Sequence, residues 1–142
     1  MRIDNTITSA AASTVTPGYS MYLFAVNNAN SKQYPSAIKL YGCKIYNNNM
    51  IVRDFIPCYN DKNVAGLYDM ISGVFYTDAA GVGFSTGIKI GNLPEGYTQL
   101  QYIQTSGTQY INSGFTPNNN SRMVLDFAAT DISVVNSIIG SR

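Results

Sequence analysis

Acidic side chains are the first candidates for chemistry in this chain, because it contains no histidine. Without histidine, neither a Ser–His nor a Cys–His nucleophile system can be assembled. Glycosidic hydrolysis would instead need two carboxyl groups about 5–10 Å apart that flank the bond. No expected strand carries two carboxylates on one face; the acids are Glu95 and Asp4, Asp54, Asp61, Asp69, Asp78, Asp126 and Asp131. We therefore expect that the chain is not an enzyme.

Cys43 and Cys58 are the two thiols, and each lies in or beside a strand of one predicted hairpin. If that hairpin turns near Asn48, Cys43 lies opposite about Arg53, and this register disfavours a direct cross-strand disulfide. Two interpretations stay open: free, half-buried thiols, which often pack like small apolar side chains, or a disulfide. A metal centre is not expected from two thiols without histidine.

Sugar binding is the second kind of chemistry that the residues suggest. Proteins bind sugars through amide and carboxylate hydrogen bonds with an aromatic face beneath the ring, and loops on a rigid scaffold usually carry such groups. Two loops have this mixture, the first with Asn27, Asn28, Asn30 and Tyr34, and the second with Tyr59, Asn60, Asp61 and Asn63. Both sets also have a structural interpretation, because asparagine forms turns and tyrosine is common in sheets.

Calcium is the one cofactor that the residue types allow. Carboxylate and amide oxygens suit this ion, and Asp61 and Asp78 both lie in polar loops. No ligand spacing supports a site at either position. We therefore expect no cofactor.

The composition is that of a β-protein with few charges. A chain of 142 residues suits one domain, and 12% of its residues are charged, against about 25% in typical domains. Such a surface, solvated by Asn, Ser and Thr, suits an extracellular, cell-surface or virion protein. The nine basic residues are scattered and the net charge is +1, so nucleic-acid binding is not expected. No apolar run approaches the ~20 residues of a membrane span, and the N-terminal stretch lacks the apolar core of a secretory signal.

Two successive hairpins between Ile38 and Gly87 form the expected centre of the fold. The first turns at Asn47 to Asn49, because asparagine tolerates positive φ. The second pairs Leu67 to Ile71 with Val74 to Thr77 around Ser72-Gly73. Asp78 to Gly83 then form a loop of small residues.

The remaining elements are expected to add strands to this centre. Ser20 to Val26 is apolar on both alternating faces, which predicts a central strand covered on both sides. Met123, Leu125 and Phe127 alternate inward along a strand from Arg122 to Ala128. The other expectations are a loop at Asn27 to Pro35, short strands at Leu100 to Gln104 and Gln109 to Asn112 around Ser106-Gly107, a turn at Thr116 to Asn120, and a last strand at Ile132 to Ile139. With no convincing helix, the pattern predicts an all-β sandwich or barrel.

Several segments resemble a laminin-G-like, concanavalin-A-like jelly-roll domain that is common in phage tail proteins and in surface proteins of Gram-positive gut bacteria. YLFAVNN (22–28), IKLYGCKIYNNNMIVRDFIPCYN (38–60) and GLYDMISGVFYTDAAGVGFSTG (66–87) resemble the C-terminal half of that domain. LPEGYTQLQYIQTSGTQYINSGFTPNNNSRMVLDF (93–127), followed by IIGSR, resembles its N-terminal start. The resemblance implies a jelly-roll β-sandwich whose halves stand in reversed order.

The reversed order divides the chain into a C-terminal-half-like part at residues 1–87, a connector at 88–99 and an N-terminal-half-like part at 100–142. Three explanations compete: a window cut across two tandem domains, a circular permutant, or halves that complete each other between chains by strand exchange. Because half a sandwich leaves a bare edge and an uncovered apolar face, neighbouring domains or identical chains are expected as partners.

The expected function is a carbohydrate-binding or adhesion module of a phage tail or bacterial surface protein, with a cell-surface glycan as ligand. The alternative is a structural module that assembles by strand exchange and has no ligand of its own.

Overall fold

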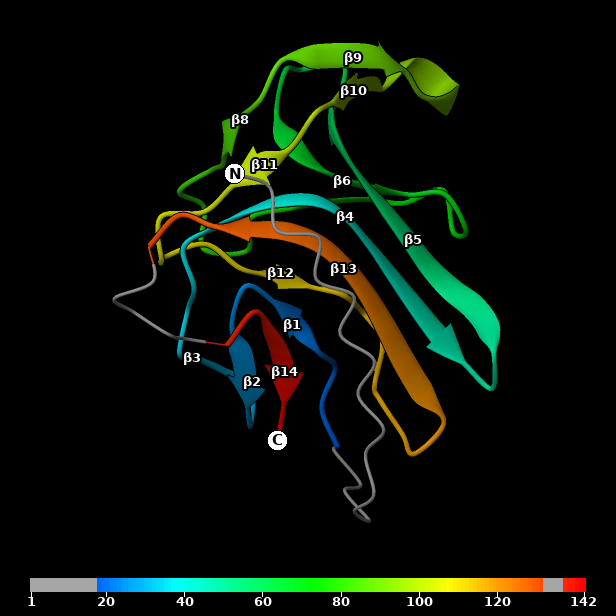
Figure 1. The fold of residues 1–142 in the computed structure, drawn as a ribbon, viewed down its shortest axis with the longest axis vertical. Coiled ribbons are helices and arrows are strands. Elements are labelled where there is room, and N and C mark those ends of the chain that lie inside the picture. The colour runs from blue at the N-terminus through cyan, green and yellow to red at the C-terminus, as the bar shows by residue number, and fades with distance from the viewer. Residues whose placement is uncertain (1–17, 132–136) are drawn as a thin grey trace.

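The computed structural model describes residues 18–131 and 137–142 as an all-β fold of two sheets (Figure 1). The smaller sheet has the order β12-β1-β14-β2-β3, from Ile111–Asn112, Tyr22–Leu23, Ile139–Ser141, Val26–Asn28 and Ser31–Gln33. The larger sheet contains β4 (Ile38–Asn47), β5 (Met50–Tyr59), β6 (Ala65–Asp69), β7 (Phe75–Thr77), β8 (Ser85–Thr86), β9 (Lys89–Asn92), β10 (Thr98–Leu100), β11 (Ile103–Gln104) and β13 (Ser121–Ala129). It curls into a half-barrel. Within the described residues the one helical element is a 3₁₀ turn at Pro94–Gly96, so the all-β prediction is confirmed.

The long hairpin of β4 and β5 is the predicted first hairpin. Asn48 and Asn49 have φ of 49° and 62°, the left-handed pair that a two-residue hairpin turn needs. A register shift at Ile45/Tyr46 places Cys43 opposite Phe55. The expected register, with Cys43 opposite about Arg53, is therefore wrong by two residues. One residue arises because the turn is centred between Asn48 and Asn49, and the other from the irregularity in the pairing, which was not visible in the residue pattern.

The two long strands separate beyond Phe55, the last residue of β5 that pairs with β4. Asp54 accepts a hydrogen bond at its carbonyl from Met70, which shows that its backbone polar groups face β6. Because these groups alternate between the two edges of a strand, those of Pro57 face the β4 side. Proline has no N–H, so it occupies the point where β5 needs no donor for β4.

Each arm of this fork receives a further strand. On the β5 arm, β10 pairs with Tyr59 and Cys58, and β9 pairs with β10. On the β4 arm, β11 pairs with Leu40 and Lys39, and β8 pairs with β11. The opposite edge of β4 is covered over its whole length by β13, with a register shift at Asp126/Phe127. Figure 1 shows the two short pairs above the diverging ends of β4 and β5.

The second predicted hairpin is confirmed, with a longer turn than expected. β6 ends at Asp69 and β7 begins at Phe75. Asp69 bonds Val74 and Gly73 through its main chain, and its carboxylate accepts the Ile71 N–H and the Ser72 hydroxyl. The aspartate thereby holds residues 70–73 as a loop, where two-residue turn geometry was expected.

The expected single strand from Ser20 to Val26 is wrong in its continuity but right in its burial. Phe24 has φ of 70°, which ends β1 and reorients the chain before β2. The Phe24 N–H donates to Ile138 and its carbonyl accepts from Ser36. Residues 21–25 are all buried. The apolar pattern on both faces therefore predicted the burial correctly, but it did not predict the interruption of the strand at Phe24.

The segment from Asn27 to Pro35 is a tight hairpin where a loop was expected. β2 and β3 pair in antiparallel register around Ala29 and Asn30, whose φ values are 51° and 66°. The segment at 88–99 is likewise more than a connector, since it contains β9 and the start of β10, joined through Glu95 and Gly96 in the left-handed region.

The two parts of the chain interleave in both sheets. β12 and β14 lie on either side of β1, while β10, β11 and β13 complete the sheet of β4 to β8. β11 and β12, which flank Ser106-Gly107 in the sequence, lie in different sheets. Described strands from both parts of the chain therefore share each sheet.

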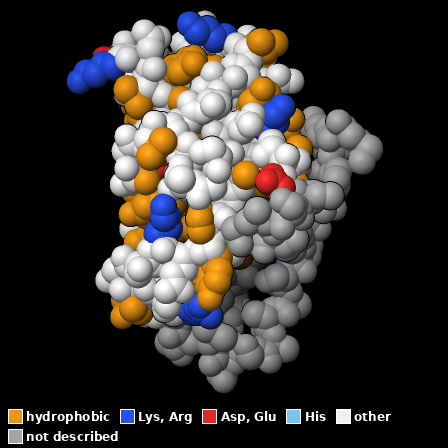
Figure 2. Space-filling view, turned by 90° about the vertical axis from the view of Figure 1, so that its left-hand side faces the viewer, with side chains coloured by type: hydrophobic (Ala, Val, Ile, Leu, Met, Phe, Trp, Pro, Cys, Tyr) orange, Lys and Arg blue, Asp and Glu red, His pale blue; other side chains and the backbone are white. Residues whose placement is uncertain are grey.

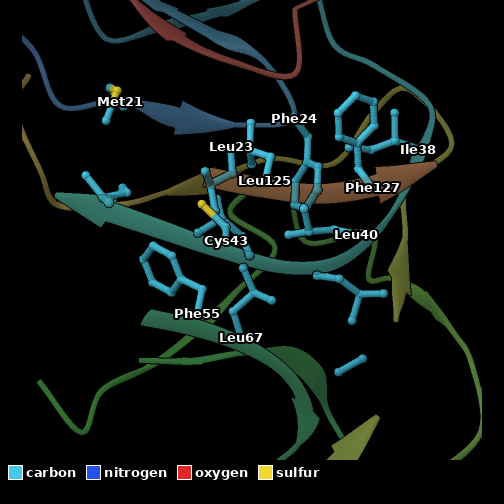
Figure 3. Packing of buried hydrophobic residues seen from close by; sticks show 14 of the residues in the cluster. Met21, Leu23, Phe24, Ile38, Leu40, Cys43, Phe55, Leu67, Leu125 and Phe127 are labelled. Carbon is cyan, nitrogen blue, oxygen red and sulfur yellow. The ribbon is translucent and has the colours of Figure 1, made fainter. Parts of the chain in front are cut away.

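The hydrophobic core lies between the two sheets (Figure 3). Met21, which precedes β1, and Leu23 of β1 belong to one cluster with Leu40 and Cys43 of the larger sheet; further members include Ile45, Phe55, Leu67, Ile103, Ile111, Leu125 and Phe127. Met123 packs against the core from the same strand as Leu125 and Phe127, so the predicted inward face of this strand is confirmed. Ala128, which the alternation places outward, is buried, next to the register shift at Asp126/Phe127. Of the last predicted strand, residues 132–136 lie outside the described residues, and β14 covers Ile139–Ser141.

Gly66 of β6 is closely packed against Phe75 and Tyr76 of β7. A Cβ at this position would lie 2.2 Å from the Tyr76 carbonyl oxygen and 2.7 Å from the Phe75 ring. We predict that Gly66→Ala lowers the free energy of unfolding by about 1–3 kcal/mol, because backbone cannot move aside cheaply. Urea unfolding measures this.

Gly42→Ala is the matched control, because its Cβ would meet only ordinary contact at 3.7 Å. Its stability should change by less than about 0.5 kcal/mol. Equal losses in the two variants would contradict the packing around Gly66.

Candidate functional site

The two predicted sugar-binding loops lie on different sheets and do not form one site. The first is the β2–β3 hairpin of the smaller sheet, near the bottom of Figure 1. The second connects β5 to β6 in the larger sheet, at its opposite end. A shared groove between Tyr34 and Tyr59 is therefore absent, and each loop must be considered alone.

The asparagines of the first loop mainly build the hairpin. Asn27 is fully buried, its amide donates to the Ser20 carbonyl, and its Oδ1 accepts from the Asn30 N–H. Asn30 itself is exposed in the left-handed region, and Asn28 is half-buried in β2. Asn27 is therefore not available to a ligand, which leaves Asn28 and Asn30 at the surface.

Tyr34 is the prominent side chain of this loop. Its exposed fraction is 52%, and its φ of 50° is unusual for an aromatic residue. The Arg142 guanidinium lies 5.3 Å from the ring centroid and donates through Nη2 to Oε1 of Gln33, at 3.3 Å. An aromatic ring, a guanidinium and an amide thus meet at one exposed place.

Gln33 and Arg142 were missed by sequence reasoning. Gln33 sits between two predicted site residues, but amide side chains are too common in this chain to single it out. Arg142 comes to Tyr34 only because β14 pairs with β2, which places Ser141 opposite Asn27. No local signal in the sequence predicts that contact.

The second loop is held mainly by its own asparagines. Oδ1 of Asn60 accepts the N–H groups of Lys62 and Val64, and its carbonyl accepts from Asn63, whose φ is 57°. Asp61 is exposed at the tip. The loop is therefore an asparagine-capped turn, the structural interpretation left open by the sequence.

Tyr59 packs against the core rather than projecting from the surface. Its hydroxyl and the Thr86 hydroxyl are 2.8 Å apart, and this hydrogen bond joins β5 to β8. Lys89 of β9 lies 5.7 Å from the ring centroid. The ring therefore fills the space between the arms of the fork, and it offers a ligand less surface than Tyr34 does.

Tyrosine–cation pairs recur over the surface. Figure 2 shows one face on which Lys and Arg side chains lie beside hydrophobic ones, with few acidic groups. The other pairs, with the distance from cation to ring centroid, are Lys32–Tyr110 at 5.7 Å, Lys39–Tyr102 at 4.6 Å and Arg122–Tyr46 at 4.0 Å. Tyr34 is the large exposed ring among them.

Asp78, one of the two calcium candidates, is occupied by the main chain. Its Oδ1 accepts the N–H groups of Ala80 and Tyr110, and its Oδ2 those of Val82 and Gly83, all within 3.0 Å. A cation would have to displace these donors. No group of three or more His, Cys, Asp or Glu side chains in the described part of the chain is placed to hold a metal.

The charged pair at Arg53 and Asp54 serves the scaffold. Arg53 donates to the carbonyls of Ser113 and Val52, and its Nε lies 3.6 Å from the buried carboxylate of Asp69. Asp54 pairs with Lys44 at 3.6 Å. Arg53 therefore ties β5 to both the β6–β7 hairpin and the segment after β12.

Both cysteines are free and buried, which decides between the two interpretations of the sequence. Burial raises the pKa of the Cys43 thiol to about 12, with the nearby Asp54 charge adding to the effect. Burial also raises the pKa of Cys58 to about 12. Such thiols are protonated near neutral pH and are poor nucleophiles.

Comparisons with known proteins found no match, so the site is interpreted from its geometry. The chain matches no family model, and neither the curated proteins nor the solved structures include a match. Among the described residues, no helix is long and apolar enough to cross a membrane. The Tyr34 surface, consisting of Tyr34, Arg142 and Gln33, offers a ligand an exposed aromatic face beside polar donors.

Asp78→Asn tests the role assigned to this carboxylate. We predict a loss of about 2–3 kcal/mol in the free energy of unfolding, because an amide NH₂ would face two N–H groups that need an acceptor. Asp61→Asn, at the exposed loop tip, should change stability by less than about 0.5 kcal/mol. Urea unfolding with and without added calcium measures both effects. A calcium-dependent rise in stability that Asp78→Asn removes would contradict the structural role.

The buried thiols make stability depend on alkaline pH. Between about pH 9 and 12 the unfolded thiols lose their protons while the folded ones keep them, so the unfolded state gains stability. We predict that the free energy of unfolding falls as the pH rises through this window. The fall should be smaller in the Cys43→Ala/Cys58→Ala double variant. Urea unfolding at pH 8 and pH 10.5 measures the free energy of unfolding of both proteins. An equal fall between these two pH values in the wild type and in the double variant would contradict the burial of neutral thiols.

Proposed function

We propose that this chain is a non-enzymatic carbohydrate-binding or adhesion module that uses the Tyr34 surface. The observation that carries this proposal is an exposed tyrosine ring flanked by a guanidinium and an amide. Sugars present apolar C–H faces and many hydroxyls, so a rigid aromatic ring beside hydrogen-bonding groups suits them.

The backbone around Tyr34 supports a positioned ring. A left-handed φ at an aromatic residue costs about 1–3 kcal/mol and persists only where the surroundings impose it. Here the Tyr34 carbonyl accepts the Ser137 N–H, and the preceding residues are held in the β2–β3 hairpin. A ring held in this way loses little conformational freedom when a ligand binds.

The scaffold is consistent with a rearranged jelly roll, the fold implied by the resemblance noted in the sequence. Two sheets enclose one core, and strands from both parts of the chain contribute to each sheet. We propose that the module acts outside the cell or on a virion, as part of a phage tail or bacterial surface protein. The low charge of the surface and its many amides support this setting.

The placement of the acids supports binding without catalysis. Asp69 and Asp78 accept main-chain hydrogen bonds, and Asp54 pairs with Lys44. None of these acids belongs to the Tyr34 surface. A hydrolase would need a carboxylate pair at the place where the sugar binds.

Assembly remains the alternative function, and one feature favours it. All four residues of β9 are exposed, and Ile88 and Ile90 have exposed fractions of 69% and 53%. An exposed strand edge with apolar side chains can pair with another chain. In that case the module would join identical chains or neighbouring domains and bind no glycan.

Tyr34→Ala on a glycan array tests the proposed function. We predict that the wild-type chain binds a subset of glycans and that the variant binds them about tenfold more weakly or worse, because the stacking face is lost. Tyr46→Ala, which removes the ring of another tyrosine–arginine pair, should bind as the wild type does.

Light scattering of the same samples distinguishes the alternative. A monomer that binds glycans supports the adhesion module. A defined oligomer that binds none, and that Ile90→Lys dissociates, would replace it with the assembly module.

A further inference from the structure

Arg142 is held at the Tyr34 surface by its main chain. Its N–H donates to the Asn27 carbonyl at 2.9 Å, and its carbonyl accepts the Ala29 N–H at 3.4 Å. These bonds continue the parallel pairing of β14 with β2, in which Ser141 lies opposite Asn27. The guanidinium therefore extends from a fixed point of the smaller sheet.

The guanidinium keeps hydrogen-bonding capacity for a ligand. It has five N–H donors in a planar fork, and one of its nitrogens, Nη2, donates to Gln33. The ion pairs recorded between described residues are Lys44–Asp54 and Arg53–Asp69, and neither includes Arg142. Arg142 thus contributes a positive charge whose described partners are an aromatic ring and a neutral amide.

Other cations in the described structure are engaged differently. Arg53 donates to main-chain carbonyls and lies beside the Asp69 carboxylate. Lys32 donates to the Thr108 carbonyl at 2.6 Å. Arg122 lies 4.0 Å from the centroid of Tyr46, directly across the strand pair. At Arg142 the cation instead stands beside a ring that is half exposed.

We infer that the glycan bound at the Tyr34 surface carries a carboxylate, as sialic acid and uronic acid residues do. This inference rests on the proposed glycan-binding function and adds the charge of the ligand. A carboxylate matches the planar fork of a guanidinium and can accept two parallel hydrogen bonds from it. The sugar ring to which the carboxylate is attached lies on the exposed part of Tyr34. Gln33 holds the guanidinium through Nη2.

The test compares matched acidic and neutral ligands. The probes are 3′-sialyllactose against lactose, and a uronic-acid oligosaccharide against its neutral counterpart, titrated into the wild-type chain and into Arg142→Gln. We predict that the wild type prefers at least one acidic probe and that Arg142→Gln weakens this binding by about tenfold or more. The preference should also decline as salt is added.

Arg122→Gln is the matched control, because it removes another guanidinium that lies over a tyrosine. It should leave binding unchanged. Urea unfolding of both variants verifies that a lost affinity is not a lost fold.

The outcomes separate the two proposals. Neutral glycans that bind equally well, with affinity lost in Tyr34→Ala but kept in Arg142→Gln, would overturn the acidic ligand and leave the glycan-binding function standing. A preference for sulfated glycans without a carboxylate would also overturn it. Binding of no glycan at all would overturn both.

Discussion

The separation of β5 from β4 beyond Phe55 is the constraint on which the rest of the large sheet depends. Pro57 lies just past this point with its missing N–H on the β4 side, so continued pairing with β4 would lack a donor. The same strand remains paired with β6 along its other edge. One edge of β5 and one edge of β4 are thereby left open to further strands, and the sheet can curl rather than extend as a flat ribbon.

The strands that enter this fork explain why the two parts of the chain cannot be regarded as separate units. β10 pairs with the β5 arm and β11 with the β4 arm; β10 is the second strand of the β9–β10 hairpin, and β11 follows it in the chain. Tyr59 fills the space between the arms and reaches Thr86 with its hydroxyl. The described apolar side chains of the earlier strands share one core with Leu100, Ile103 and Ile111 of the later part.

A polar loop residue can either hold the loop in shape or bind a ligand, and its residue type does not show which of these it does. Asn27, Asn60 and Asp78 use their side-chain oxygens to accept main-chain N–H groups of their own loops. Each loop is rigid for that reason, and each polar side chain is correspondingly unavailable to a ligand. The ring of Tyr34 differs from these side chains because it is exposed. The β2–β3 hairpin holds it beside Arg142, a cation from a distant part of the chain.

Features that arise from neighbouring residues could be predicted from the amino-acid sequence. Asn48 and Asn49 predicted the turn between β4 and β5, and alternation predicted the inward face of β13. The pairing of the strands, the placement of β11 and β12 in different sheets and the contact between Arg142 and Tyr34 could be seen only in the folded chain. Turn chemistry and alternation act within a few residues, so they leave a local signature. The choice of a strand's partner depends on how the whole core packs, and residues far apart in the chain carry no sign of it.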